Sequence, residues 1–242
     1  LPPENILKGV THVLSCIPPS NNGEDPVLIY FSEKLKRMPL KWVGYLSTTG
    51  VYGDYQGKWV TENNIANPKQ QRSIRRLACE KQWQSLELPL QILRLPGIYG
   101  PGRSTLDVVK NQKRTMVNKP GQIFSRIHVD DIACATMHLI NLFAQGTTPK
   151  IINIADNLPA TNVEVMTYAA NLLEVPLPAI ESFENASKTM SPMALSFWEE
   201  NRKVSNNILC NDLGYNLIHP TYESGLRDCL KSSHYPPLMN TY

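Results

Sequence analysis

The sequence of 242 residues has little net charge and no long apolar run, and each scarcity excludes a class of protein. The formal net charge is +3 at pH 7, and basic residues form only short clusters near Lys34 to Lys41 and Arg72 to Arg76. Such clusters are typical of solvated helix faces, so nucleic acid is not an expected partner. Because no apolar run approaches the roughly 20 residues that span a bilayer, no membrane partner is expected either.

Cysteine is also scarce, with five residues that are scattered and never form a C-x-x-C pair. Their odd number and spacing argue against a zinc site and against a disulfide framework, so no metal is predicted. Unpaired cysteines among apolar neighbours indicate a reducing compartment, the cytoplasm or a setting such as a plastid stroma. The chain starts at Leu1 rather than Met, which predicts a processed chain or a fragment.

Four short runs dense in Val, Ile and Leu alternate with helical patterns over the first two-thirds of the chain. Runs that are apolar throughout are typical of strands buried on both faces of a parallel sheet, and helices between them indicate βαβ units. The predicted class is α/β, a partial Rossmann-like, doubly wound parallel sheet. The expected strands are "THVLSCIP" (11–18), "KWVGYLST" (41–48), "LQILRLPG" (90–97) and "IINIAD" (151–156).

Helix starts are marked by capping residues. Asn67-Pro68 predicts one helix start, Asp130 or Asp131 another, and Thr161 with Glu164 forms a capping box for a third. The last 70 or so residues have no strong strand run, so they are expected to form a small, mostly helical lobe. The predicted domains are 1–158, with a substrate-side insertion near 100–126, and 159–242.

Ligands of open parallel sheets bind beyond the carboxyl ends of the strands, so the residues after each strand are informative. "STTGVYGD" follows the second run and is itself followed by Glu62, while "LPGIYGPGR" and "RIHVDDIA" come later. Together, in this order, they resemble the extended short-chain dehydrogenase/reductase family, also called the NAD-dependent epimerase/dehydratase family. "NIADNLPATNVEV" and "LGYNLIHPTYESGL" resemble later segments of that family, so the likeness covers nearly the whole chain.

This resemblance implies a nicotinamide cofactor, NAD(P) with NADP slightly preferred, and a small-molecule substrate. Thr48 falls where the family has the Ser or Thr that bonds the reacting oxygen, and Arg103 and Arg126 are candidates for the substrate side. A homodimer through the helices that hold Leu35 and Ile74 would also be in keeping with the family. The residues that fall at cofactor-binding positions are Ser15, Cys16, Ile17, Pro18, Ser47, Thr48, Arg76, Pro96, Gly97 and Ile98.

The family's Tyr-x-x-x-Lys pair is replaced in this sequence. Counting from Pro68, the tyrosine and lysine positions hold Arg72 and Arg76, while Glu80 matches a family glutamate. Arginine is always protonated, so Arg72 cannot act as the general acid or base. Arg76 could replace the lysine as a fixed charge, or the three residues could form a solvated ladder. Tyr52 and Tyr99 are the nearest alternative proton carriers.

The family's glycine-rich turn, which holds the cofactor pyrophosphate, has no match after any strand here. When the segments of the chain are matched to those of the family in order, the chain is expected to begin just before the family's fourth strand. Cofactor binding is in doubt without the segments that come before that strand in the family. These departures resemble an atypical branch of the family. Two functions stay open, an oxidoreductase- or epimerase-like protein with a degenerate site, and a non-catalytic dinucleotide-binding or scaffolding module.

Overall fold

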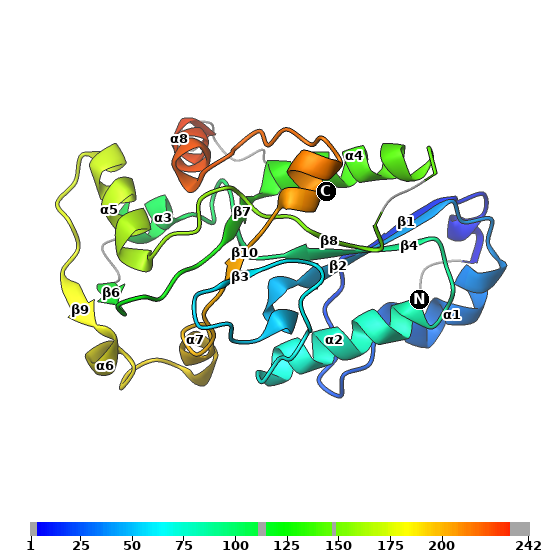
Figure 1. Ribbon diagram of the computed structural model, residues 1–242, viewed down its shortest axis with the longest axis horizontal. Coiled ribbons are helices and arrows are strands. Elements are labelled where there is room, and N and C mark those ends of the chain that lie inside the picture. Colours follow the sequence, from blue (N-terminus) through cyan, green and yellow to red (C-terminus); the bar gives the residue numbers. More distant parts are fainter. Residues whose placement is uncertain (1–3, 111–114, 147–148, 233–242) are drawn as a thin grey trace.

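The computed structural model describes residues 4–110, 115–146 and 149–232. Its centre is a four-stranded sheet in the order β1-β2-β4-β8, and every neighbouring pair is parallel (Figure 1). The fold class predicted from the apolar runs is therefore confirmed. The strands are β1 (His12–Ser15), β2 (Trp42–Thr48), β3 (Trp59–Val60), β4 (Leu90–Leu95), β5 (Gly97–Tyr99), β6 (Met116–Asn118), β7 (Arg126–His128), β8 (Ile151–Asn153), β9 (Ile180–Ser182) and β10 (Lys203–Val204).

Helices cover both faces of this sheet, because strands that are apolar throughout need apolar cover on each side. Helices α1 and α2 pack on one face, around Tyr45, Trp83 and Ile92, while α4 and the turn η3 cover the other, around Leu93 and Leu139. The helices are α1 (Pro26–Arg37), α2 (Gln71–Gln84), α3 (Thr105–Lys110), α4 (Val129–Phe143), α5 (Asn162–Leu173), α6 (Phe183–Ala186), α7 (Pro192–Ser196) and α8 (Tyr222–Ser232), with short turns η1 (Glu4–Leu7), η2 (Thr49–Tyr52) and η3 (Ile208–Asp212).

Two of the predicted helix starts are wrong by a few residues. Helix α2 begins at Gln71 rather than near Pro68, because Asn67 stays extended against the η2 turn and its amide donates to the carbonyl of Tyr52. Helix α4 is capped by the ring of His128, which accepts from the Asp130 amide, so neither predicted aspartate caps it. The capping box of Thr161 and Glu164 is confirmed at the start of α5.

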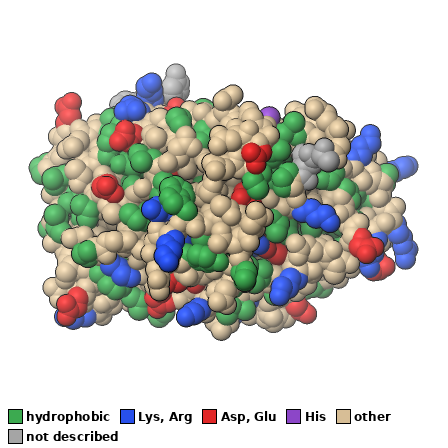
Figure 2. All heavy atoms as spheres, viewed as in Figure 1, with side chains coloured by type: hydrophobic (Ala, Val, Ile, Leu, Met, Phe, Trp, Pro, Cys, Tyr) green, Lys and Arg blue, Asp and Glu red, His purple; other side chains and the backbone are tan. Residues whose placement is uncertain are grey.

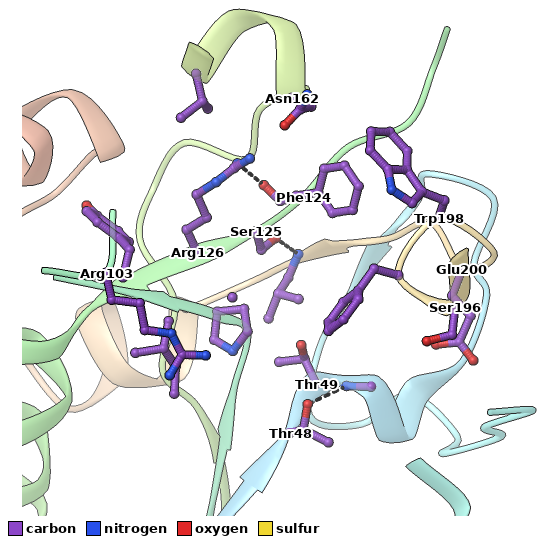
Figure 3. Close-up of a pocket in the computed structure, with 18 of the residues that line it drawn as sticks. Thr48, Thr49, Arg103, Phe124, Ser125, Arg126, Asn162, Ser196, Trp198 and Glu200 are labelled. Atoms are coloured by element: carbon purple, nitrogen blue, oxygen red, sulfur yellow. Dashed lines mark hydrogen bonds between the residues drawn. The ribbon is translucent and has the colours of Figure 1, made fainter. Parts of the chain in front are cut away.

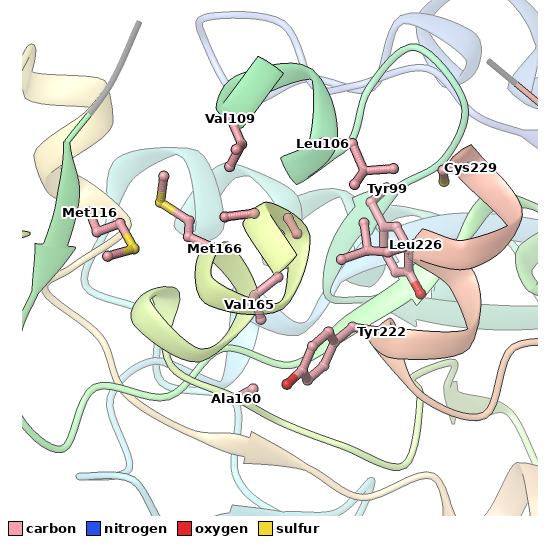
Figure 4. Packing of buried hydrophobic residues seen from close by; sticks show 12 residues of the cluster. Tyr99, Leu106, Val109, Met116, Ala160, Val165, Met166, Tyr222, Leu226 and Cys229 are labelled. Atoms are coloured by element: carbon pink, nitrogen blue, oxygen red, sulfur yellow. The ribbon is translucent and has the colours of Figure 1, made fainter. Parts of the chain in front are cut away.

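A second cluster of elements lies beside the sheet, at the left of Figure 1. Helices α3, α5 and α8 enclose an apolar core that includes Leu106, Val165 and Leu226 (Figure 4). Strand β6 pairs with β9 in this cluster, and β3 pairs with β10 closer to the central sheet. Both pairs join a segment before residue 158 to one after it. The 100–126 segment, predicted to be an insertion on the substrate side, supplies α3 and β6 to this cluster.

Of the two basic clusters, the one near Lys34 to Lys41 forms a solvated face, with Lys36, Arg37 and Lys41 exposed. Lys and Arg side chains are interspersed with Asp and Glu over the face in Figure 2 and do not gather into a patch of one sign. Of the two residues proposed for a dimer interface, Leu35 is buried in the core and cannot contact a partner, whereas Ile74 is exposed. None of the helices in the described ranges has the length and hydropathy that crossing a membrane requires.

Candidate functional site

A cavity of about 900 Å³ lies where the carboxyl ends of β2 and β4 meet the second cluster of elements. This is the edge at which open parallel sheets bind their ligands. Thr48 ends β2 on one side, and Trp198 and Glu200 come from the C-terminal segment on the other (Figure 3). The cavity is thus shared between the sheet and the residues beyond it.

Thr48 has a defined orientation at the end of β2. Its Oγ1 accepts a hydrogen bond from the Gly50 amide at 3.1 Å and so caps the η2 turn. Since an acceptor role leaves the hydroxyl proton free, Thr48 can donate to an oxygen inside the cavity. Ser73, on the first turn of α2, packs so closely that a Cβ added to Gly50 would lie 2.6 Å from its hydroxyl. The sequence did not indicate Ser73 as a cavity residue, because only the folded structure brings it next to Gly50.

The structure brings together some of the predicted cofactor-binding residues and separates others. Ser15, Cys16, Ile17 and Ser47 are not part of the cavity wall within the described residues, although the Ile17 carbonyl accepts from Arg76. Those that do line the cavity are Pro18, Thr48, Arg76, Pro96, Gly97 and Ile98.

Ser47 instead points to the face of the sheet that α2 covers, where it donates to Glu80. Glu80 is buried and holds Arg94 in a bidentate ion pair, with its oxygens 2.7 and 3.1 Å from the guanidinium nitrogens. Burial alone would lower the pKa of Arg94, but the hydrogen bonds and charge of Glu80 raise it instead. The solvated ladder of Arg72, Arg76 and Glu80 is therefore wrong, because Glu80 is turned into the core.

The two arginines at the family's tyrosine and lysine positions lie in different surroundings. The Arg72 guanidinium stacks on the ring of Phe197, 3.7 Å from its centroid, at the mouth of the cavity. Arg76 donates to Tyr45 and to the carbonyls of Ile17 and Leu46, and so ties the ends of β1 and β2 together.

Neither tyrosine considered as a replacement proton carrier is suited to that role. The hydroxyl of Tyr52 donates to Asn153 at 2.8 Å inside the core, and Tyr52 does not line the cavity. Tyr99 does line it, but its hydroxyl is buried against Gly225 and has no hydrogen-bond partner among the described residues. Burial raises the pKa of both hydroxyls, which keeps them protonated at neutral pH.

The cavity wall is rich in arginine. Among the arginines of the wall, only Arg202 pairs with a carboxylate of the described residues, and its partner is Glu200 at 2.9 Å. Arg126 donates to the backbone carbonyls of Phe124 and Ala160, and burial lowers its pKa. The six arginines of the wall are Arg72, Arg75, Arg76, Arg103, Arg126 and Arg202. A cavity of this composition attracts an anion.

Aromatic and acidic residues complete the wall. Phe124 and Trp198 meet edge to face with ring centroids 5.2 Å apart, and both face the cavity (Figure 3). One oxygen of Glu200 binds Arg202, while the other is buried without a partner in the described residues. Sequence reasoning did not single out Trp198 and Glu200, because they belong to a loop-rich segment with no motif. Glu62, singled out with the motif "STTGVYGD", lies elsewhere and accepts from the Asn153 amide.

Solved structures of similar proteins were found by comparison of folds. A conserved protein of unknown function from Silicibacter pomeroyi DSS is 39% identical, with a TM-score of 0.86 over 95% of this chain and 80% of that one. A Methylobacillus flagellatus protein, provisionally described as an NAD-dependent epimerase/dehydratase, is 26% identical, with a TM-score of 0.72 over 93% and 77%. The UDP-glucuronic acid 4-epimerase of Bacillus cereus in complex with NAD is 16% identical, with a TM-score of 0.73 over 94% and 75%.

No protein-family model matches the chain, and no curated protein matches it either. At 16% identity the epimerase shows a shared fold only, which is the Rossmann-like fold of NAD-dependent epimerases and dehydratases. The Silicibacter pomeroyi protein is similar enough in sequence and coverage to show common family membership.

Proposed function

The chain belongs to the family of the conserved Silicibacter pomeroyi protein and has the fold of NAD-dependent epimerases and dehydratases, and from this premise we propose that it is an NAD(P)-binding, oxidoreductase-like protein for an anionic small molecule. The observation that carries the proposal is the arginine-walled cavity at the carboxyl edge of the sheet. A sugar nucleotide is the favoured substrate class over a neutral carbonyl or alcohol.

The charges of the cavity support this choice of substrate. Five of the six arginines form no ion pair within the described ranges, so an incoming anion would not have to displace a carboxylate. Guanidinium groups bind phosphate and carboxylate with two parallel hydrogen bonds. The free, buried oxygen of Glu200 and the neighbouring ring of Trp198 would suit the hydroxyl groups and the apolar face of a sugar.

Thr48 and Arg76 have separate roles in this proposal. Thr48 donates from the end of β2 to the oxygen of the reacting carbon, since its own acceptor position is occupied by Gly50. Arg76 sets the spacing of the strand ends near the cofactor and adds a fixed positive charge. The NAD(P) cofactor would supply or accept the hydride, with NADP slightly preferred, and would lie along Pro96, Gly97 and Ile98.

Proton transfer limits any turnover. Arg72 cannot exchange a proton at neutral pH, and it is turned toward Phe197. General acid–base catalysis contributes typically about 10²- to 10⁴-fold to a rate, so a site without a proton carrier is expected to be slow by that factor. A non-catalytic dinucleotide-binding or scaffolding module is the second candidate, favoured by this same arginine.

Cofactor fluorescence and turnover separate the two candidates. NADH and NADPH are titrated into the protein, followed by UDP-glucuronic acid as an anionic sugar nucleotide, while absorbance reports hydride transfer. Saturable binding of cofactor and sugar nucleotide with turnover supports the oxidoreductase, and binding without turnover supports the module. Failure of both ligands to bind would overturn the proposal.

A matched pair of variants tests Thr48. Thr48→Val removes the hydroxyl and keeps the shape, and it should lower turnover about 10-fold or more if the hydroxyl binds the reacting oxygen. Thr189→Val, on the exposed surface away from the cavity, is the control and should leave turnover unchanged. Equal turnover by the two variants would remove Thr48 from the mechanism.

A homodimer through α1 and α2 is part of the same proposal, and its interface would use exposed residues of these helices rather than the buried Leu35. Ile74 on α2 and Ile29 and Tyr30 on α1 are exposed apolar side chains. Sedimentation equilibrium of the wild type and of Ile74→Lys should show a dimer that dissociates in the variant. A wild-type monomer at high concentration would exclude it.

A further inference from the structure

Two histidines and two aspartates gather on the side of β7 and α4 that faces α8, outside the cavity wall. The group consists of His128, Asp130, His219 and Asp228, and one ligand atom from each lies within 4.8 Å of all the others. His128 ends β7 and Asp130 opens α4, while His219 lies in the loop before α8 and Asp228 on α8 itself. Three separate segments therefore converge on one point.

We propose that these four residues bind a divalent transition-metal ion, Zn²⁺ in the first instance, which fastens the start of α8 to the start of α4. Two imidazole nitrogens and two carboxylate oxygens form a ligand set that zinc takes in tetrahedral geometry. Two aspartates would also compensate the charge of the ion. The proposal is independent of the function of the cavity.

The distances suit closure around an ion. Asp130 Oδ2 lies 3.6 Å from His128 Nδ1 and 3.7 Å from His219 Nε2. Ligand atoms of a tetrahedral zinc site, with bonds of about 2.0–2.1 Å, lie about 3.3 Å apart. The Asp130 side chain is 55% exposed, so it can rotate toward the ion and an ion can enter past it. The Asp228 side chain is half-buried, and its carboxylate lies within 4.8 Å of the ligand atoms of the other three residues.

The tautomer of His128 also fits a ligand role. The Nδ1 lone pair accepts only a long bond of 3.3 Å from the Asp130 amide, and an ion bound to this nitrogen would replace that bond. Its Nε2 lies 3.6 Å from the Cys229 sulfur, which can accept a hydrogen bond from the N–H of this nitrogen.

His219 is held in place by a separate residue. Asp131 is fully buried and accepts from the Ile218 and His219 amides at 2.7 and 2.9 Å and from the Tyr215 hydroxyl at 3.0 Å. These bonds fix the loop that carries His219, and its ring lies 4.1 Å from that of His128, centroid to centroid. A preorganised second histidine lowers the entropic cost of binding an ion.

Titration calorimetry with ZnCl₂, on the complete chain first stripped with EDTA, tests the proposal directly. The titration should show one saturable site for Zn²⁺. Thermal unfolding should show a Tm that rises by about 5 °C or more when the free Zn²⁺ concentration is 100 times Kd, with no such rise in MgCl₂. Co²⁺ in place of Zn²⁺ should show visible absorption of a four-coordinate ion without a thiolate charge-transfer band. The absence of a saturable site, or a thiolate band, would overturn the assignment.

Isosteric variants show whether binding occurs at this group. Asp130→Asn and Asp228→Asn each keep the side-chain shape, and both should weaken Zn²⁺ binding at least 10-fold. Asp212→Asn, an exposed aspartate outside the group, is the matched control, and His12→Gln controls for an exposed histidine. Unchanged Zn²⁺ affinity in Asp130→Asn and Asp228→Asn would place the ion elsewhere and refute the proposal.

Discussion

Arg94 on strand β4 and the arginines of the cavity wall carry the same charge in opposite surroundings. Arg94 is buried and donates to both carboxylate oxygens of Glu80, so the negative charge of Glu80 balances its positive charge. Arg103 and Arg126 face the cavity without an ion-pair partner among the described residues. The comparison teaches that a paired buried charge belongs to the fold, whereas an unpaired charge in a cavity is available to a ligand.

Removal of the charge of Glu80 should produce the largest effect. Glu80→Gln leaves Arg94 buried without its counter-charge, so the free energy of unfolding should fall by about 3–5 kcal/mol. Denaturant unfolding measures it. Glu33→Gln, which breaks the exposed pair with Lys36, is the control and should leave stability unchanged. If the two variants behaved alike, the contrast between Arg94 and the cavity arginines would fail.

Another buried carboxyl, outside the cavity wall, is incompletely paired. Asp156 is buried beside Arg126; one oxygen accepts from the Leu158 amide and the other has no partner among the described residues. Burial raises its pKa to about 7 from the ordinary 3.8. Between pH 4 and 7 the folded state thus binds more protons than the unfolded state, so this group makes stability fall as pH rises.

Asp156→Asn mimics the protonated form and should remove that fall. The variant should match the wild type near pH 4 and exceed it by up to about 4 kcal/mol above pH 7, three pKa units at 1.36 kcal/mol each. Thermal unfolding at a series of pH values from 4 to 8 measures the difference. A constant offset between the two proteins across this range would contradict the raised pKa.

Ser47 and Ser15 are both buried, but they differ in hydrogen bonding, so together they separate the effect of a hydrogen bond on stability from the effect of burial. Ser47 donates to Glu80, so Ser47→Ala should cost about 1–2 kcal/mol of unfolding free energy. Ser15 is equally buried, but its hydroxyl has no partner in the described part of the chain, so Ser15→Ala should be neutral or stabilising. Equal losses in both would show that packing, rather than the bond to Glu80, matters at Ser47.

Arg103 should give the smallest effect on stability. Arg103→Ala removes an exposed side chain of the cavity wall, and unfolding free energy should change by less than about 0.5 kcal/mol. Its affinity for UDP-glucuronic acid, measured by calorimetry, should fall several-fold and lose part of its dependence on salt. A stability loss as large as that of Glu80→Gln, with unchanged affinity, would assign Arg103 to the fold.

The sheet could be predicted from the sequence because its signal is local. Each strand is a run of apolar residues, and the capping box at Thr161 lies within four residues. The start of α4 could not be predicted correctly, since His128 caps it in place of either aspartate.

The motifs at the ends of strands predicted part of the cavity wall, because Thr48 ends β2 and Pro96 follows β4. They also indicated Arg103 and Arg126, which line the same cavity. Trp198 and Glu200 reach the cavity from a segment distant in sequence and without regular periodicity. The group of His128 and His219 was missed for the same reason, because its members are separated by 91 positions in the chain.

One close contact links the outer helix to the inside of the cavity. Gly225 on α8 lies against Tyr99, and a Cβ added there would stand 2.1 Å from the tyrosine hydroxyl oxygen. Tyr99 forms part of the cavity wall and packs edge to face on His128 at 5.2 Å (Figure 4 shows Tyr99 beside α8). A single methyl group at position 225 would therefore narrow the cavity from outside, so the width available to a ligand depends on a helix that the ligand never touches.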